Sequence, residues 1–367
     1  MPSLGSPALS PAPQPVPHDA RFLLAQVEAE LRNRLPAFGV PASVALTEKT
    51  IRSLLAEIEI KAHADEAPLK TTPCRLDGVE VATAYSFERK LGGVATGIHD
   101  GMVVLSPAWE RHLTPWLCHR LQDLIGFELA TLRIPGVKMP PAAPDRFKLR
   151  NRSLTAVMRA DRAQEVMRLG DSFERLLEGT IPNTRRSLKR CLDDAAEENV
   201  HFSFVAEALA PDPTALRQLA AKNLSGVKSF QTVASAAQFV AAQARPFHTM
   251  LTHPDGHAMS ACGGFIEGDL GLVAYQLAHR ADRDSSPGVT LRAFLIRALI
   301  EQGVRYLAFV GNGAGLLTHS CEAVTAAELL MMRNTRSARL KYWACSMLQP
   351  HSRIAQIGVL PRQAKTA

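Results

Sequence analysis

Long apolar segments are absent from this 367-residue sequence, since no run approaches the ~18 to 20 residues that a membrane-spanning helix needs. The longest one, at 270–278, contains Gln276 and has the length of a strand. The N-terminus also lacks the basic stretch followed by an apolar stretch that marks a signal peptide. From these absences we expect a cytoplasmic protein without a transmembrane segment.

Cysteine is scarce and irregularly placed, with six residues that form no CxxC pair and follow no fixed spacing. Several of them stand within apolar stretches, so we expect buried free thiols in a reducing compartment. The GxSxG motif of serine hydrolases and the P-loop motif are likewise missing. The glycines at 311–315 follow a predicted strand, but the third one comes one residue early for a dinucleotide fingerprint. These patterns argue against hydrolase, P-loop and Rossmann-type functions.

A group of histidines near Asp255 has the composition of a metal site, with His248, His253 and His257 close by in sequence. Their spacing matches no helical zinc motif, and they bracket the turn-forming residues 254–256. We therefore expect a hairpin turn at this point and no metal.

Acidic residues are absent after Glu328, whereas seven Lys or Arg follow it. Between residues 146 and 190 there are twelve Lys or Arg and five acids, and the whole chain has a net charge of +7. Such a distribution favours anionic partners, namely phosphorylated cofactors, RNA or acidic lipid headgroups. A solvated helix face followed by a basic tail explains the same charges and stays open as an alternative.

Prolines divide the chain. Six of them fall within residues 1–18. Four more, with a glycine, fall within 135–144, where we expect a linker between two domains, although a strand could extend from one domain to the other there. The expected organisation is a disordered tail at 1–19, an N-terminal α/β lobe at 20–144, a second domain at 145–348 and a basic C-terminal tail at 349–367.

Hydrophobic periodicity predicts helices and strands in both lobes. The predicted helices cover residues 20–35, 47–63, 107–124, 172–177, 183–197, 213–221, 234–244 and 290–301. The predicted strands cover residues 79–85, 92–98, 102–105, 128–134, 166–169, 200–205, 247–252, 258–266, 270–278 and 306–310. Antiparallel strands that lead into a helix and then a further strand indicate an α+β (mixed α/β) fold and not a pure Rossmann alternation.

The segment 274–302 is the most informative part of the chain. A predicted strand ends near Ala278, a polar loop follows, and Ser286 and Pro287 suit the N-cap and first position of a helix. Free N–H groups at a helix start can hold a pyrophosphate, and Gly288 would let a phosphate approach the backbone closely. An ordinary capped helix is the alternative interpretation.

Several short motifs occur in a characteristic order in the second half of the chain. They are TRRSLKR at 184–190, DGHA at 255–258, Tyr275, SPGVTL at 286–291 and FVGNG at 309–313. In this order they resemble the GNAT-superfamily acetyltransferase-like proteins of the cellulose-biosynthesis (CelD-like) and Fem-type group, over roughly residues 165–345. The resemblance implies a GNAT-like fold in the C-terminal half, with an N-terminal lobe that is accessory or a degenerate GNAT-like copy.

The resemblance also implies a reaction, the attack of an amine on a thioester, with acyl-CoA as the expected donor, or on another activated acyl donor, without a metal. Such a reaction needs a base, an oxyanion donor and an acid for the leaving thiolate. Tyr275 could supply the acid, His319 the base, and Asn312 could position the acceptor. Core packing, a simple hydrogen bond and the shaping of a turn are their alternative roles. The expected donor-binding residues are Arg280, Arg283, Ser286, Gly288, Val289 and Thr290.

Three functions therefore follow from the sequence. The first is an N-acyltransferase that moves an acyl group from acyl-CoA to an amine on a small molecule, sugar, lipid or peptide. The second is a Fem-like transferase that uses aminoacyl-tRNA as the donor and binds it through the basic surface. The third is a GNAT-like interaction protein without catalysis.

Overall fold

The computed structural model of this chain describes residues 44–91, 94–106, 114–136, 148–150, 153–206, 212–222, 230–279, 286–311 and 315–348. The two expected tails and the expected helix at 20–35 lie outside these ranges. The expected lobe boundary at residue 144 lies outside them too.

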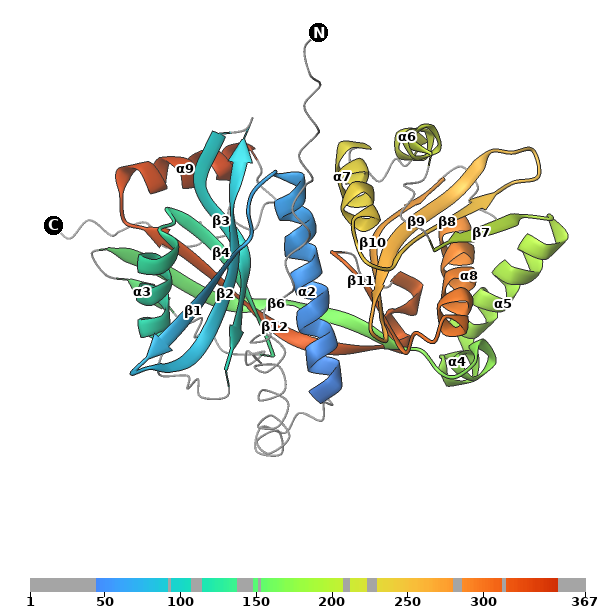
Figure 1. The fold of residues 1–367 in the computed structure, drawn as a ribbon, viewed down its shortest axis with the longest axis horizontal. Helices are drawn as coiled ribbons and strands as arrows, with labels where there is room; N and C mark the ends of the chain where they lie inside the picture. Colours follow the sequence, from blue (N-terminus) through green and yellow to red (C-terminus); the bar gives the residue numbers. More distant parts are fainter. Residues whose placement is uncertain are drawn as a thin grey trace, which may run out of the picture.

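The described chain forms helices and strands that cluster into two halves (Figure 1). The strands are β1 (Lys70–Leu76), β2 (Val79–Leu91), β3 (Val94–Leu105), β4 (Leu129–Pro135), β5 (Lys148–Arg150), β6 (Leu154–Arg168), β7 (His201–Val205), β8 (Pro246–Thr252), β9 (Ala258–Glu267), β10 (Leu270–Ala278), β11 (Tyr306–Phe309) and β12 (Cys321–Arg333). The helices are α2 (Val44–Ala64), α3 (Thr114–Ile125), α4 (Phe173–Gly179), α5 (Pro182–Glu197), α6 (Pro213–Lys222), α7 (Phe230–Ala241), α8 (Pro287–Glu301) and α9 (Arg336–Leu348), with a 3₁₀ helix η3 at Gly315–Ser320.

One continuous sheet of 12 described strands connects the two halves, in the order β1-β2-β3-β4-β12-β6-β11-β10-β9-β8-β7, with β5 beside β6. Each half contains the same unit. In the first, β1, β2 and β3 are antiparallel, and α3 leads to β4, which is parallel to β3. In the second, β8, β9 and β10 are antiparallel, and α8 leads to β11, which is parallel to β10. The expected mixed α/β fold is confirmed.

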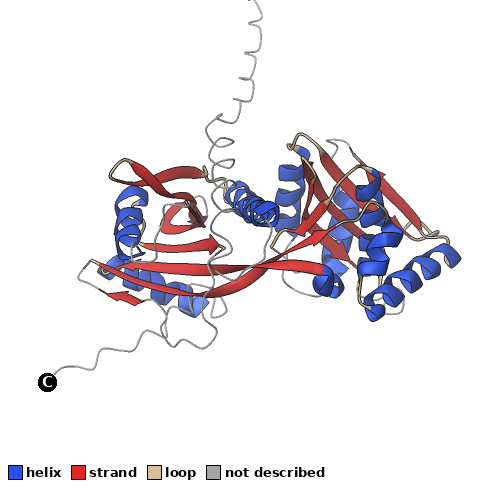
Figure 2. Ribbon diagram, turned by 90° about the horizontal axis from the view of Figure 1, so that it is seen from below, coloured by secondary structure: helices blue, strands red, loops and turns tan. Residues whose placement is uncertain are grey.

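The two long strands β6 and β12 run from one half of the molecule to the other, as the view from below shows (Figure 2). They pair with each other, while β12 also pairs with β4 and the end of β6 pairs with β11. The expected strand at 166–169 is therefore only the end of a strand of 15 residues. Polar residues between 159 and 165 interrupt the apolar pattern, so the sequence indicated a shorter strand.

A second correction concerns β3, where the sequence predicted two separate strands at 92–98 and 102–105. The structure has one strand through Gly101, because the segment stays extended against β2. A Cβ at Gly101 would lie 2.1 Å from the Tyr85 carbonyl oxygen. The glycine therefore allows two strands to approach closely and does not mark a turn.

Helices cover both faces of the C-terminal half of the sheet (Figure 1). On one face, Leu291 and Leu295 of α8 pack into a core that includes α5 and α4. On the other face, Val233 and Val240 of α7 share a core with Tyr275 of β10, to which α6 and α2 also contribute. The sheet separates these two cores, so a β10 side chain on the α8 face cannot contact one on the α7 face.

Helix α2 lies between the two halves and contacts both (Figure 1). Its first half forms ion pairs with the turn between β9 and β10. Lys49 Nζ lies 2.5 Å from an Asp269 oxygen, and Arg52 Nε lies 2.5 Å from a Glu267 oxygen. These pairs fix α2 against the C-terminal half.

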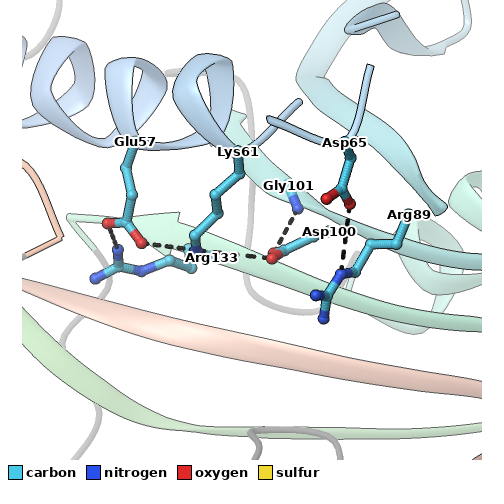
Figure 3. A network of polar contacts seen from close by, with 7 residues as sticks. All are labelled: Glu57, Lys61, Asp65, Arg89, Asp100, Gly101 and Arg133. Carbon is cyan, nitrogen blue, oxygen red and sulfur yellow. Dashed lines mark hydrogen bonds and ion pairs between the residues drawn. The ribbon is translucent and has the colours of Figure 1, made fainter. Parts of the chain in front are cut away.

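The second half of α2 carries a polar network over the N-terminal half (Figure 3). Glu57 accepts a hydrogen bond of 2.8 Å from Arg133 of β4, and its other oxygen lies 2.8 Å from Lys61 Nζ. Lys61 also lies 3.7 Å from Asp100 of β3. Because Glu57 and Arg133 are both buried, this pair is a specific contact of α2 with the sheet.

None of the described helices is both long enough and apolar enough to cross a membrane.

Candidate functional site

The parallel strands β10 and β11 part in the middle of the C-terminal half. Their pairing runs from Leu270↔Tyr306 to Val273↔Phe309, whereas β10 continues to Ala278. At the same point β10 is irregular against β9, with a register shift after Val273. Beyond the parting, the edge of β10 that paired with β11 has no strand partner among the described residues, so an extended ligand has a strand edge to follow there.

The first turn of α8 lies at this parting and is held by side chains from the sheet. Ser260 Oγ donates a hydrogen bond of 3.0 Å to the Pro287 carbonyl. Gln276 Nε2 donates one of 2.9 Å to the Gly288 carbonyl. Ser286 occupies the expected N-cap position with a left-handed backbone, φ 44°, and its side chain makes no capping hydrogen bond. Position and orientation of this helix start are therefore set by β9 and β10.

Arg292, one turn into α8, places its guanidinium between the parted strands. Its Nε donates a hydrogen bond of 2.8 Å to Gln276 Oε1, and its Cζ lies 4.7 Å from the centroid of the Phe309 ring. A Cβ at Gly315 would lie 2.7 Å from Arg292 Nη1, so Gly315 lies directly against the guanidinium. Burial lowers the pKa of Arg292, yet an arginine stays cationic at neutral pH.

Sequence reasoning missed Gln276 and Arg292 as site residues. Two signals were present, since Gln276 is the polar residue in the apolar run 270–278, and Arg292 stands four residues after Gly288 on the same helix face. Their pairing depends on the packing of α8 on β10, which no local pattern shows.

A shallow pocket adjoins the first turn of α8 on the side of α5. Its lining includes Pro287 and Thr290 of α8 with Cys191, Asp194 and Glu198 at the end of α5. Burial raises the pKa of the Cys191 thiol. Two carboxylates in a pocket suit a protonated amine better than a phosphate, because only the amine is attracted by their charge.

Tyr275 lies on the opposite face of the sheet from α8. Its hydroxyl and His248 Nδ1 are 2.9 Å apart across β9, and both residues are buried. Gly263 stands between them, where a Cβ would lie 2.5 Å from the tyrosine hydroxyl. Burial raises the pKa of Tyr275 and lowers that of His248 to about 4. Within the described chain, His248 Nε2 has no hydrogen-bond partner.

The remaining predicted site residues are not brought together with Tyr275. His319 is exposed in η3, and Gly288, Val289 and Thr290 form the first turn of α8 on the other face. Arg280, Arg283 and Asn312 lie outside the described residues. The structure thus joins the α8 residues to the parted strands and places Tyr275 in a separate buried pair.

The buried His248 is expected to make the protein less stable in acid. The pKa of His248 is about 4 in the folded chain, below the ordinary value of 6.5. Between these two pH values the unfolded chain binds a proton at His248 and the folded chain does not. The contribution of neutral His248 to the free energy of unfolding is complete above pH 6.5 and falls as the pH drops toward 4. Between about pH 7 and pH 5 the wild type should lose roughly 2 kcal/mol more than His248→Gln. Urea unfolding of both proteins at several pH values measures the difference, and parallel profiles would refute it.

Comparison with known proteins yields structural likeness only. No protein-family model matches the sequence, and no curated protein matches it either. Solved structures that are similar include L-PGS from Bacillus licheniformis, with 12% identity, a TM-score of 0.45 and coverage of 78% of this chain and 92% of that chain. FemX shows 9% identity, a TM-score of 0.47 and coverage of 83% and 95%.

A GCN5-related N-acetyltransferase from Kribbella flavida shows 12% identity, a TM-score of 0.41 and coverage of 76% of this chain and 95% of that chain. At such identities and TM-scores the likeness assigns neither a donor nor an acceptor. The structural neighbours of this mixed α/β chain thus include an L-PGS protein, FemX and a GCN5-related N-acetyltransferase.

Proposed function

We propose that this protein is a GNAT-type N-acyltransferase that moves an acyl group from acyl-CoA to an amine, with the donor between β10 and β11. The observation that supports this most is the parting of the two parallel strands after Val273 and Phe309, with Arg292 held inside it. A strand edge can bind an extended amide-containing arm, and a fixed cation can act on the group at its end.

The proposed reaction follows from that placement. The amine nitrogen attacks the thioester carbon, and a new C–N bond forms as negative charge gathers on the carbonyl oxygen. The Arg292 guanidinium stabilises this oxyanion, because it is already oriented by Gln276 and Phe309. The C–S bond then breaks, the thiolate leaves with the electron pair, and the proton lost by the amine completes the thiol.

The other roles come from the sequence and remain part of the proposal. Ser286 and Gly288 would face the phosphates at the start of α8, with Arg280 and Arg283 from the segment before it. The N–H groups of Val289 and Thr290, also expected to bind the donor, already donate to the Ser286 carbonyl and would not be free for phosphate. His319 and Asn312 would serve the proton transfers and the acceptor, whereas the Tyr275 hydroxyl, buried against His248 on the other face of the sheet, would not reach the donor. The acceptor would be an amine on a small molecule, sugar, lipid or peptide in a cytoplasmic reaction, as in the CelD-like and Fem-type group.

Acetyl-CoA should bind the purified protein, and Arg292→Met should weaken that binding by about tenfold or more. Since Arg292 faces the thioester end, CoA without an acyl group should lose less affinity than acetyl-CoA. Isothermal calorimetry with both ligands measures these changes.

Arg297→Met is the matched control, because Arg297 is an exposed arginine on the same helix that pairs with Glu301 at 3.8 Å. It should leave both affinities unchanged. Absence of any binding at millimolar acetyl-CoA, or of longer acyl-CoA, would remove acyl-CoA as the donor.

A second donor, aminoacyl-tRNA, is favoured by the surface of α5. Arg186, Lys189 and Arg190 are exposed along this helix at the outer end of the molecule (Figure 1). Binding of aminoacyl-tRNA would weaken steeply with salt, since cations that neutralise phosphates release counterions. Salt-dependent tRNA binding without acetyl-CoA binding selects this donor, and the absence of both supports a GNAT-like protein without catalysis.

A further inference from the structure

The hairpin turn between β8 and β9 is closed by its own backbone. The N–H of Gly256 donates to the His253 carbonyl at 2.8 Å, and the N–H of His253 donates to the His257 carbonyl at 3.0 Å. Gly256 has φ 89°, a conformation that glycine adopts without strain. The turn expected from the sequence is therefore present, and its short length fixes where the side chains of its residues point.

Three of those side chains converge. Asp255 Oδ1 lies 3.1 Å from His253 Nδ1 and 2.5 Å from His257 Nδ1, and the two imidazole rings stack with centroids 4.8 Å apart. One ligand atom from each residue lies within 4.8 Å of the others. Each side chain is more than a third exposed, so the group is open to solvent.

Hydrogen bonds from the two imidazoles and from the His257 N–H to the Asp255 carboxylate hold the three side chains together. The backbone N–H of Asp255 points to His253 Nδ1 at 3.4 Å, and in this contact the nitrogen is the acceptor. The same nitrogen lies 3.1 Å from the Asp255 carboxylate, which is also an acceptor. A proton on His253 Nδ1 satisfies this contact, and a divalent cation in its place would bind ligand atoms of all three side chains. His257 adds a second imidazole nitrogen to the same oxygen.

We propose that His253, Asp255 and His257 bind one divalent transition-metal ion of the Zn²⁺ class. Two imidazole nitrogens and one carboxylate oxygen suit ions such as Zn²⁺, Co²⁺ and Ni²⁺, whereas Mg²⁺ and Ca²⁺ prefer oxygen ligands alone. The expectation of a turn without a metal came from helical zinc spacings, which a hairpin does not need to follow. Here alternate residues reach one point because the backbone reverses between them.

The three side chains, and therefore the proposed ion, lie beside the end of β10. The ring of His257 lies 6.5 Å from that of His279, the last described residue of the segment that ends β10. The N–H of His279 bonds to the Met259 carbonyl, so β10 ends beside this hairpin. Three protein ligands leave a tetrahedral ion with one open position, as in sites that bind water or a substrate atom.

The test is a titration of the full chain, purified without a histidine tag, with Co²⁺ followed by its visible d–d absorption. A saturable band at a single equivalent is expected, and Zn²⁺ should displace it. Asp255→Asn and His257→Ala should each weaken Co²⁺ binding by about tenfold or more. His201→Ala is the matched control, because His201 is an exposed histidine on β7 of the same sheet, and it should bind as the wild type does.

Circular dichroism shows whether each variant is folded, and Asp255→Asn keeps an oxygen that can accept the His257 N–H, now at 3.0 Å. A Co²⁺ band that never saturates overturns the proposal. So does an affinity that is equal in the wild type, Asp255→Asn and His257→Ala, since the ion would then bind elsewhere. Because the measurement follows metal binding and no acyl transfer, its result does not depend on the proposed function.

Discussion

Glu57→Met is expected to lower the free energy of unfolding by about 3 to 5 kcal/mol, the largest loss we predict for a side chain of this protein. Glu57 lies between Arg133 and Lys61, with 2.8 Å to each (Figure 3). Its removal leaves two cations near each other, and Arg133 is only 5% exposed. Methionine keeps the length of the side chain and the helix propensity of α2, so the loss reports the charge. Urea unfolding at neutral pH measures it.

A double-mutant cycle separates the ion pair from general packing. Arg133→Met alone should also destabilise, because Glu57 then loses its buried cationic partner. The double variant, with both residues changed to Met, should lose less than the sum of the two single variants, since it buries no unpaired charge.

The exposed pair Arg175–Asp171, at 3.4 Å, provides the control, and removing Arg175 should cost less than about 1 kcal/mol. Additive losses in the Glu57 cycle would show that the two side chains are not coupled.

Gly264→Ala in β9 is expected to cost about 3 kcal/mol, at the upper end of overpacking in a core. A Cβ there would lie 2.0 Å from the Leu272 carbonyl oxygen and 2.6 Å from Phe247 Cζ. Gly264 is paired with Phe247 on one side and Val273 on the other, so the backbone cannot move without disturbing three strands. The smaller freedom of alanine in the unfolded chain offsets at most about 1 kcal/mol.

Gly271→Ala, on the neighbouring strand β10, is the matched control for this substitution. The nearest atoms to its Cβ would be side-chain methyl groups, at 3.3 Å from Leu299 and 3.4 Å from Val304. Methyl groups can move by a few tenths of an ångström, so this variant should lose clearly less stability. Comparable urea midpoints for the two variants would contradict the role given to the close backbone approach at Gly264.

The strands of the C-terminal half were predicted well because their signals are local. The expected strand 270–278 is β10 as the structure has it, and the helix expected at 213–221 is α6 with one further residue. In β10 an apolar run is bounded by a turn signal on one side and polar residues on the other, so neighbours in sequence decide its ends. A long strand that runs from one half of the molecule to the other is not one apolar run with polar residues only at its ends. For this reason β6 was predicted too short.

In the candidate site too, features set by neighbouring residues were predicted and contacts between distant elements were not. Ser286 and Pro287 begin α8 at the predicted positions, because proline suits the first turn of a helix, although the Ser286 side chain makes no capping hydrogen bond. The partner of Tyr275 was not predicted, since His248 reaches it from a strand two positions away across Gly263. Arg292 was missed for a similar reason, as its contacts with Gln276 and Phe309 join a helix to two strands.

The sequence by itself determined the mixed α/β character, most elements of the C-terminal half and the hairpin turn at 253–257. Each of these follows from hydrophobic period, turn residues and caps, which act over a few neighbouring residues. Only the tertiary structure decided the continuous sheet, the parting of β10 from β11, the Glu57–Arg133 pair and the convergence of His253 and His257 on Asp255. Those features depend on which distant side chains share a face, and that choice is made by packing and register across strands.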